Sequence, residues 1–179
     1  MDTYSIQQIL ERCLIEKYTE VKRLFEEVIF ETIRMEICER FGWDKETCRK
    51  ISEKGESDLL KYAHENGCQW SEYTCSCTSY HGQLECLKYA HENGCQWDST
   101  ACTNASLMGH LECLKFAHES GCLWDEDTCI NASTYGHLEC LRYAMEQGCR
   151  IDMWECLKNA KGECKGYLRS IMVDVSMIE

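Results

Sequence analysis

One phrase recurs along this chain at intervals of 27 residues. It reads SDLLKYAHENGCQW at 57–70, LECLKYAHENGCQW at 84–97 and LECLKFAHESGCLW at 111–124. A period of about 20 to 50 residues is typical of an array of stacked structural units. The sequence therefore divides into units at 44–70, 71–97, 98–124 and 125–151, a degenerate fifth unit at 152–179, and a separate segment at 1–43.

The second half of each unit has the pattern of an amphipathic helix. In the third unit, Leu111, Leu114 and Ala117 recur at helical spacing, with charged residues between them. Gly121 follows as the left-handed residue that ends the helix. Glycine recurs at the equivalent place in the other units, as Gly67, Gly94 and Gly148.

The first half of each unit predicts a shorter helix. In the fourth unit we expect Asp125 to cap its N-terminus, with Cys129 and Ala132 on one face. A turn at Gly136 and His137 then leads into the second helix. Two short antiparallel helices cannot bury their apolar face alone, so each unit is expected to stack on its neighbours.

Sixteen cysteines leave three alternatives, namely a disulfide ladder, a row of metal sites, or a packing role. The helical setting and the lack of a secretory pattern at the N-terminus favour free, buried thiols in a reducing compartment. The recurring positions need a small apolar side chain where helices approach closely. They are Cys75, Cys102, Cys129 and Cys156 on the first helices, and Cys86, Cys113 and Cys140 on the second.

Three units also place a histidine four residues before a cysteine, which could supply two zinc ligands. These pairs are His64/Cys68, His91/Cys95 and His118/Cys122. A closed zinc site needs four ligands, the sequence has no CxxC pair, and Met145 replaces the histidine in the fourth unit. We therefore predict that these residues pack, with no metal and no cofactor.

Residues 109–122, GHLECLKFAHESGC, resemble the second helix of an ankyrin repeat, usually written GHLEVVKLLLEAGA. Residues 127–137, DTCINASTYGH, are similar to the pattern TPLHLAAxxGH of the same family if Thr128 takes the place of the proline. The resemblance recurs in register four times, from about residue 43 to the end. It implies an all-α, ankyrin-like helical solenoid that binds another protein.

The length of the unit departs from the family pattern. An ordinary ankyrin repeat has about 33 residues, and the residues missing from this 27-residue unit fall where the family carries its β-hairpin finger. The sequence CLWDED is too short for a finger and predicts a tight link anchored by Trp124. Short repeats of this type resemble those of large DNA viruses of amoebae and algae.

The resemblance also implies where a partner would bind, because the first helices and links of the family line its concave face. Positions that differ between units do not share one packing requirement, so we take them as candidate partner-binding residues. The alternative is drift on a solvated face. The candidates are Glu72, Tyr73, Ser76, Tyr80, His81, Thr100, Thr103, Leu107, Met108, Asp127, Ile130, Thr134 and Tyr135.

The net charge of -12 argues against nucleic acid and anionic lipid as partners, because both attract a surface rich in Lys and Arg. If charge steers a protein partner, that partner is basic; otherwise the acidic surface only aids solubility. No apolar run approaches the length of about 18 residues that suggests a membrane span. We expect a cytoplasmic, reducing location, which the viral resemblance places in an infected host cell.

Motifs of catalysis are missing from the sequence, which has no nucleophile elbow, phosphate loop or paired-carboxylate motif. Cys/His pairs recur from unit to unit, whereas a catalytic site is expected once. We therefore predict that the protein is not an enzyme.

Residues 1–43 fall outside the repeat and read as helical, with apolar stripes that include Leu10, Leu14 and Leu24. A solenoid needs a polar cover over its exposed end, so the main prediction is an N-terminal helical cap. Dimerisation through these stripes is one alternative, and the oligomeric state stays open. The other is docking in a structural or ubiquitin-ligase-type assembly, by analogy with viral ankyrin proteins that carry an F-box-like segment. The usual Leu-Pro start of that segment is absent here.

Overall fold

The computed structural model describes residues 45–71 and 73–176, and within these ranges the chain forms helices and no strands. The helices are α2 (Lys45–Lys54), α3 (Ser57–Glu65), α4 (Thr74–Tyr80), α5 (Leu84–Glu92), α6 (Thr100–Met108), α7 (Leu111–Glu119), α8 (Glu126–Tyr135), α9 (Leu138–Glu146), α10 (Met153–Asn159) and α11 (Gly162–Ser176). The predicted all-α fold is confirmed. The predicted N-terminal cap at 1–43 and the candidate residue Glu72 lie outside the described residues.

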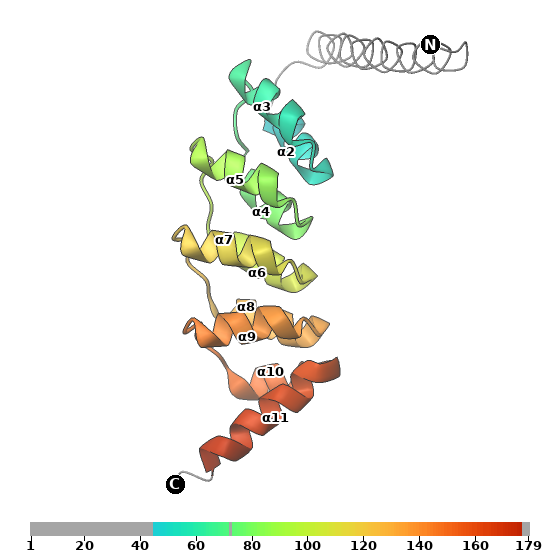
Figure 1. Cartoon of the computed structure of the whole chain (residues 1–179), viewed down its shortest axis with the longest axis vertical. Helices are drawn as coiled ribbons and strands as arrows, with labels where there is room; N and C mark the ends of the chain where they lie inside the picture. The colour runs from blue at the N-terminus through green and yellow to red at the C-terminus, as the bar shows by residue number, and fades with distance from the viewer. Residues whose placement is uncertain (1–44, 72, 177–179) are drawn as a thin grey trace, which may run out of the picture. The chain divides into compact units, whose positions relative to one another are not determined.

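The helices form antiparallel pairs that stack in one row (Figure 1). We call α2, α4, α6, α8 and α10 the first helices, and α3, α5, α7, α9 and α11 the second helices. The first helices follow one another along one side of the row and the second helices along the other. Neighbouring first helices pack more closely than neighbouring second helices do.

A repeated leucine forms the centre of the core. It lies on the second helix of every pair and is 0% exposed at all five positions, Leu60, Leu87, Leu114, Leu141 and Leu168. An alanine three residues later is equally buried in the first four pairs. Leu168 lies in α11, so the last pair buries the same core position although its sequence has diverged.

Small side chains let the first helices approach each other. Cys75, Cys102, Cys129 and Cys156 are fully buried on successive first helices. Ala101, Ala105 and Ala132 are fully buried beside them. The packing role predicted for the repeated cysteines is therefore confirmed, as it is for Cys86, Cys113 and Cys140 on the second helices.

The prediction of free thiols is wrong at one place, where Cys48 of α2 and Cys68 after α3 form a disulfide. The pairing of the first and second helices brings these two residues together, with their Cα atoms 6.4 Å apart. That separation lies within the range that a disulfide spans. The sequence argument considered compartment and packing, and it did not pair these two positions.

The helix ends follow the glycine pattern but only part of the capping pattern. Gly121 ends α7 with φ of 86°, and Gly67, Gly94 and Gly148 adopt the same left-handed conformation in their units. Asp125 is the N-cap residue of α8, as predicted, although its side chain makes no capping hydrogen bond. One unit later, the carboxylate of Asp152 accepts hydrogen bonds from the N–H groups of Trp154 and Glu155.

The repeated histidine stacks on the tryptophan that follows it in the same unit. The ring centroids of His118 and Trp124 lie 3.7 Å apart at an interplanar angle of 8°, and Tyr143 of the next unit packs edge-on against both. His91 stacks on Trp97 and His64 on Trp70 in the same way. These contacts join a second helix, the link and the next second helix, which gives the histidines a packing role.

The fourth unit replaces both partners of this stack at once, with Met145 for histidine and Ile151 for tryptophan. We therefore expect His118→Met and Trp124→Ile each to destabilise the array, and the double variant to cost about 1 kcal/mol less than the sum of the two. Urea denaturation of the four proteins in this cycle measures the coupling. Strict additivity would contradict the stacking interpretation.

Candidate functional site

The candidate residues lie on or beside the first helices α4, α6 and α8. Seven of the described candidates are exposed, namely Tyr73, Tyr80, His81, Thr100, Met108, Asp127 and Tyr135. Four are half-buried, namely Thr103, Leu107, Ile130 and Thr134. Ser76 is buried, and its hydroxyl donates to the carbonyl of Tyr73. The array thus brings the candidates to one side, as two rows at opposite ends of the first helices.

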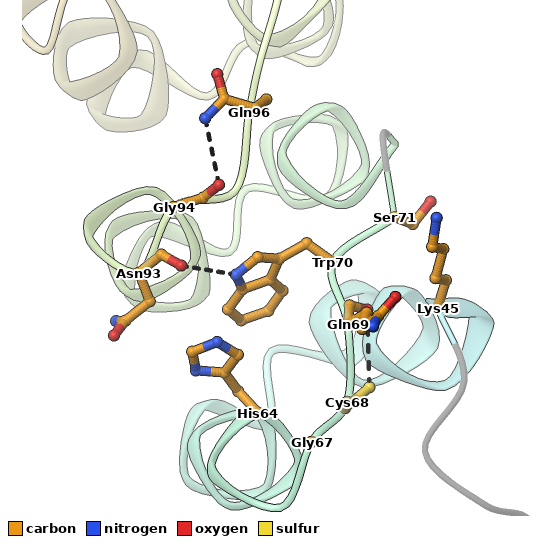
Figure 2. A pocket seen from close by; sticks show the side chains of 10 residues that line it. All are labelled: Lys45, His64, Gly67, Cys68, Gln69, Trp70, Ser71, Asn93, Gly94 and Gln96. Carbon is orange, nitrogen blue, oxygen red and sulfur yellow. Dashed lines mark hydrogen bonds between the residues drawn. The ribbon is translucent and has the colours of Figure 1, made fainter.

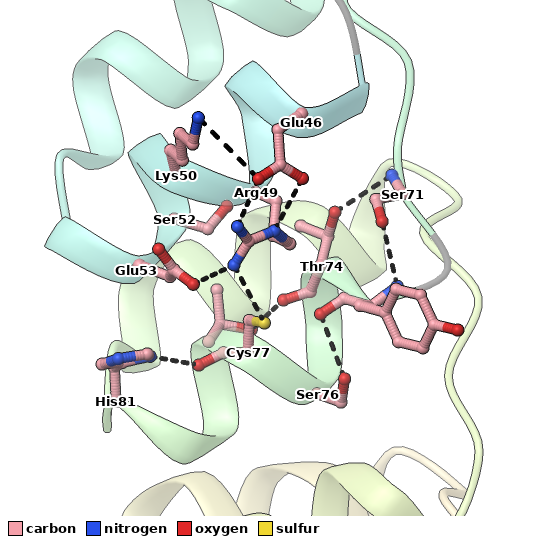
Figure 3. Close-up of polar contacts among 12 residues, drawn as sticks. Glu46, Arg49, Lys50, Ser52, Glu53, Ser71, Thr74, Ser76, Cys77 and His81 are labelled. Carbon is pink, nitrogen blue, oxygen red and sulfur yellow. Dashed lines mark hydrogen bonds and ion pairs between the residues drawn. The ribbon is translucent and has the colours of Figure 1, made fainter.

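The first row lies at the N-terminal ends of these helices and begins with Tyr73, which is 59% exposed. Short hydrogen bonds fix its backbone (Figure 3). The N–H of Tyr73 donates to the Ser71 hydroxyl at 3.2 Å, and the N–H of Ser71 donates to the Thr74 hydroxyl at 3.0 Å. These bonds hold the backbone of Tyr73 at the start of α4, where its side chain is exposed.

A depression of about 370 Å³ lies between α4 and α6 beside this row. Tyr73, Ser76, Asp98, Thr100 and Asn104 line it. The amide of Asn104 donates to the carbonyl of Ser76 at 3.2 Å and joins the two helices there. Asp98 accepts hydrogen bonds from the N–H and the hydroxyl of Thr100, so its carboxylate is held at the rim.

The second row lies at the C-terminal ends of the first helices. It presents Tyr80, Met108 and Tyr135, which are 38%, 41% and 54% exposed. His81 packs edge-on against Tyr80, and the ammonium of Lys161 lies 5.6 Å from the centre of the Tyr135 ring. Together with Leu107, these side chains form an apolar edge, and Lys161 lies beside it.

One exposed aromatic residue was missed from the sequence. Trp154 is 74% exposed on α10, and it occupies the position that Tyr73, Thr100 and Asp127 occupy in earlier units. The repeat could have revealed it, because 27 residues separate Trp154 from Asp127. The first row therefore has an aromatic side chain at each end.

Among the first helices, α2 has a surface different from that of α4, α6 and α8. Arg49 takes the position of Ser76 and forms ion pairs with Glu46 and Glu53 (Figure 3). Its guanidinium also donates to the sulfur of Cys77 on α4 at 3.8 Å. These charges pair with one another on α2, so the candidate surface begins at α4.

A second depression, of about 610 Å³, lies on the links between the first and second units (Figure 2). His64 and Trp70 stack on its wall with ring centroids 4.4 Å apart. The indole N–H of Trp70 donates to the carbonyl of Asn93 at 2.9 Å. His64, Trp70 and Asn93, which line this depression, thus join two units to each other. None of the candidate residues lines it.

The second helices α5 and α7 expose charged side chains. Lys88 pairs with Glu85 at 3.0 Å, and Lys115 pairs with Glu112 at 3.1 Å, in the same register. Such exposed pairs contribute little to stability and are typical of a solvated surface. Among residues 45–71 and 73–176, no cluster of three or more His, Cys, Asp or Glu is arranged to hold a metal ion.

Comparison with known proteins agrees with this geometry. Residues 75–118, which run from α4 through most of α7, match the family model described as ankyrin repeats (many copies). The fold is an ankyrin-like helical solenoid. No curated protein matches the chain significantly. No helix within the described part of this ankyrin-like array is long and apolar enough to cross a membrane.

Proposed function

We propose that the array is a protein-interaction module, an adaptor or scaffold that binds a partner protein along its first helices without catalysis or a cofactor. The distribution of exposed large apolar side chains carries this proposal. Five of them lie on or directly before first helices, namely Tyr73, Tyr80, Met108, Tyr135 and Trp154. Aromatic and methionine side chains are enriched at protein interfaces and supply much of their binding energy.

The partner we propose presents basic residues. The helices α4, α6 and α8 contain no Lys or Arg. Asp98, Asp125, Glu126 and Asp127 are exposed at the N-terminal ends of α6 and α8. A basic segment would meet complementary charge beside the aromatic row, which raises the rate of association and favours one orientation.

The packing of the array also supports the side of the first helices as the binding surface. Neighbouring first helices pack more closely than neighbouring second helices do, as helices do on the inner side of a curved solenoid. Solenoids use such extended inner surfaces for binding. Ankyrin repeats in general mediate protein–protein interaction, and residues 75–118 match that family.

The test is capture of a partner by the full chain and by a variant with Tyr80→Ala, Met108→Ala and Tyr135→Ala. We expect the variant to bind any captured partner at least about 10-fold more weakly, because exposed aromatic anchors are lost. Affinity for the purified partner should also fall as salt rises, since opposite charges are screened.

The matched control replaces exposed apolar residues away from the first helices, with Leu123→Ala and Val173→Ala. Leu123 is 80% exposed on a link and Val173 is 52% exposed on α11. The control should retain full affinity, and all three proteins should unfold at similar urea concentrations. Equal binding by the triple variant and the native chain would contradict the proposed surface.

A further inference from the structure

Each of the first four units brings two cysteines that are distant in sequence into contact. One lies in the first helix, and the other follows the glycine that ends the second helix. The four pairs are Cys48/Cys68, Cys75/Cys95, Cys102/Cys122 and Cys129/Cys149. The two members of each pair are 20 residues apart in the sequence. The antiparallel helix pair makes this contact, because it returns the chain to the level where the first helix began.

The four pairs have the same place in the fold but differ in covalent state. Cys48 and Cys68 form a disulfide, whereas the six cysteines of the other pairs are thiols. Each thiol pair occupies the positions of Cys48 and Cys68 in its own unit, and the thiol of Cys75 donates to the carbonyl of Cys95 at 3.8 Å. The Cα atoms of Cys48 and Cys68 lie 6.4 Å apart, and the same helix pairing places the equivalent thiol pairs within the reach of a disulfide.

The two sulfurs of a thiol pair are not equivalent. Cys122 is 3% exposed beside the link, whereas Cys102 is fully buried. A hydrogen bond from the Cys102 thiol and another from the Cys102 backbone N–H lower the pKa of Cys122. The pKa of Cys102 is raised, first by its hydrogen bond to Cys122 and then by burial. The two shifts favour Cys122 over Cys102 as the cysteine that loses its proton first.

The same asymmetry recurs in the neighbouring units. The pKa of Cys95 is lowered by the thiol of Cys75, and the pKa of Cys149 is lowered by the thiol of Cys129. Cysteines outside the pairs behave differently, because burial raises the pKa of Cys113 to about 11.

We propose that the three thiol pairs are oxidation sites, at which a peroxide links the first helix of a unit to the segment that follows its second helix. The Cys122 thiolate attacks one oxygen of hydrogen peroxide, the O–O bond breaks, and Cys122 becomes a sulfenic acid. The departing hydroxide takes up the proton that the thiol released and leaves as water. The Cys102 thiol then attacks the sulfenic sulfur, the S–O bond breaks, and a second water leaves. Two thiols lose two electrons, and one peroxide becomes two waters.

This modification is independent of partner binding and changes the array itself. Each disulfide would close the chain around one pair of helices, as the Cys48–Cys68 bond does in the first unit. A cross-link of this kind restricts the unfolded chain, so oxidation is expected to raise the temperature of unfolding by several degrees.

The test oxidises the reduced, folded full-length chain with hydrogen peroxide and maps disulfides by mass spectrometry of unreduced peptides. We expect Cys75–Cys95, Cys102–Cys122 and Cys129–Cys149 to form, each with a loss of about 2 Da. Disulfides that join different units, sulfinic acids at the paired cysteines, or thiols that stay reduced would each overturn the proposal.

Two variants and a control check the roles within one pair. Cys122→Ser should lose the third-unit disulfide alone, and Cys113→Ser should form all three. Cys102→Ala should leave Cys122 as a sulfenic acid that a dione reagent traps, because its thiol partner is gone. Circular dichroism confirms that each variant is folded before oxidation. Loss of every disulfide in folded Cys122→Ser, or failure to trap the sulfenic acid in folded Cys102→Ala, would contradict the proposed chemistry.

Discussion

Leu114→Ala is expected to lower the free energy of unfolding by about 3–5 kcal/mol. Leu114 is 0% exposed on α7 and belongs to the same core cluster as Leu87 and Leu141 of the adjacent units. The substitution removes buried apolar atoms and leaves a cavity that packed helices on both sides hold open. Because a solenoid gains much of its stability from contacts between neighbours, the loss falls on two interfaces at once.

Urea denaturation followed by circular dichroism measures this effect, and two leucines provide matched controls. Leu111→Ala makes the same chemical change at a half-buried position of the same helix, and should cost less than half as much. Leu168→Ala empties an equally buried position in the last pair, which has a neighbour on one side only among the described helices. Equal costs at Leu111 and Leu114 would show that the repeated leucine is not the centre of the core.

The repeat explains why much of the fold could be predicted from sequence. When one position holds leucine, alanine or glycine in every unit, a shared packing or backbone requirement is the simplest cause. Leu114, Ala117 and Gly121 were assigned on this basis, and the structure places the first two in the core and the third at a left-handed helix end. The fold class followed from the same comparison of units with each other.

Contacts that cross between units were not accessible in this way. His118 stacks on Trp124 and also hydrogen-bonds, through Nδ1, to the hydroxyl of Tyr143 at 3.1 Å. Tyr143 lies 25 residues further along the chain, on the next second helix. A pattern within one unit shows that the histidine repeats, but it does not show what the histidine touches.

The cysteine pairs escaped prediction for a related reason. Cys102 and Cys122 belong to one unit, yet their contact depends on how tightly the helix pair closes and on where the link begins. Sequence reasoning grouped the cysteines by helix, as packing residues, and considered Cys122 only as a partner of His118. In the structure the ring of His118 faces Trp124, while the thiol of Cys122 donates to the carbonyl of Asp98 at 3.1 Å.

The exposure of the candidate residues was predicted in part. Differences between units pointed to Tyr73, Met108 and Tyr135, and these side chains are exposed. Ser76 varies equally between units but is buried, and its hydroxyl donates to the carbonyl of Tyr73. A position that varies between units has no packing requirement common to all of them. Whether its side chain is exposed depends on the size and direction of that side chain.

Gly109→Ala is expected to cost about 2–4 kcal/mol, well above the usual cost of alanine at an exposed turn. Gly109 has φ of 75°, which alanine adopts at a cost of about 1–2 kcal/mol. A Cβ added there would also lie 2.8 Å from Cγ and Cε1 of His137, the turn histidine of the next unit. That ring is held in place, because its Nε2 hydrogen-bonds to the carbonyl of Leu107 at 3.1 Å.

Gly136→Ala is the control that separates backbone strain from the collision. Gly136 occupies the same turn one unit later with φ of 84°, but the nearest atom to its added Cβ is 3.8 Å away. The two variants should share the cost of the left-handed conformation, so their difference of about 1–2 kcal/mol measures the packing of His137 on Gly109. In a His137→Ala background that difference should disappear. If it persists there, the turn glycine is required for its backbone alone, and the histidine does not hold adjacent units together.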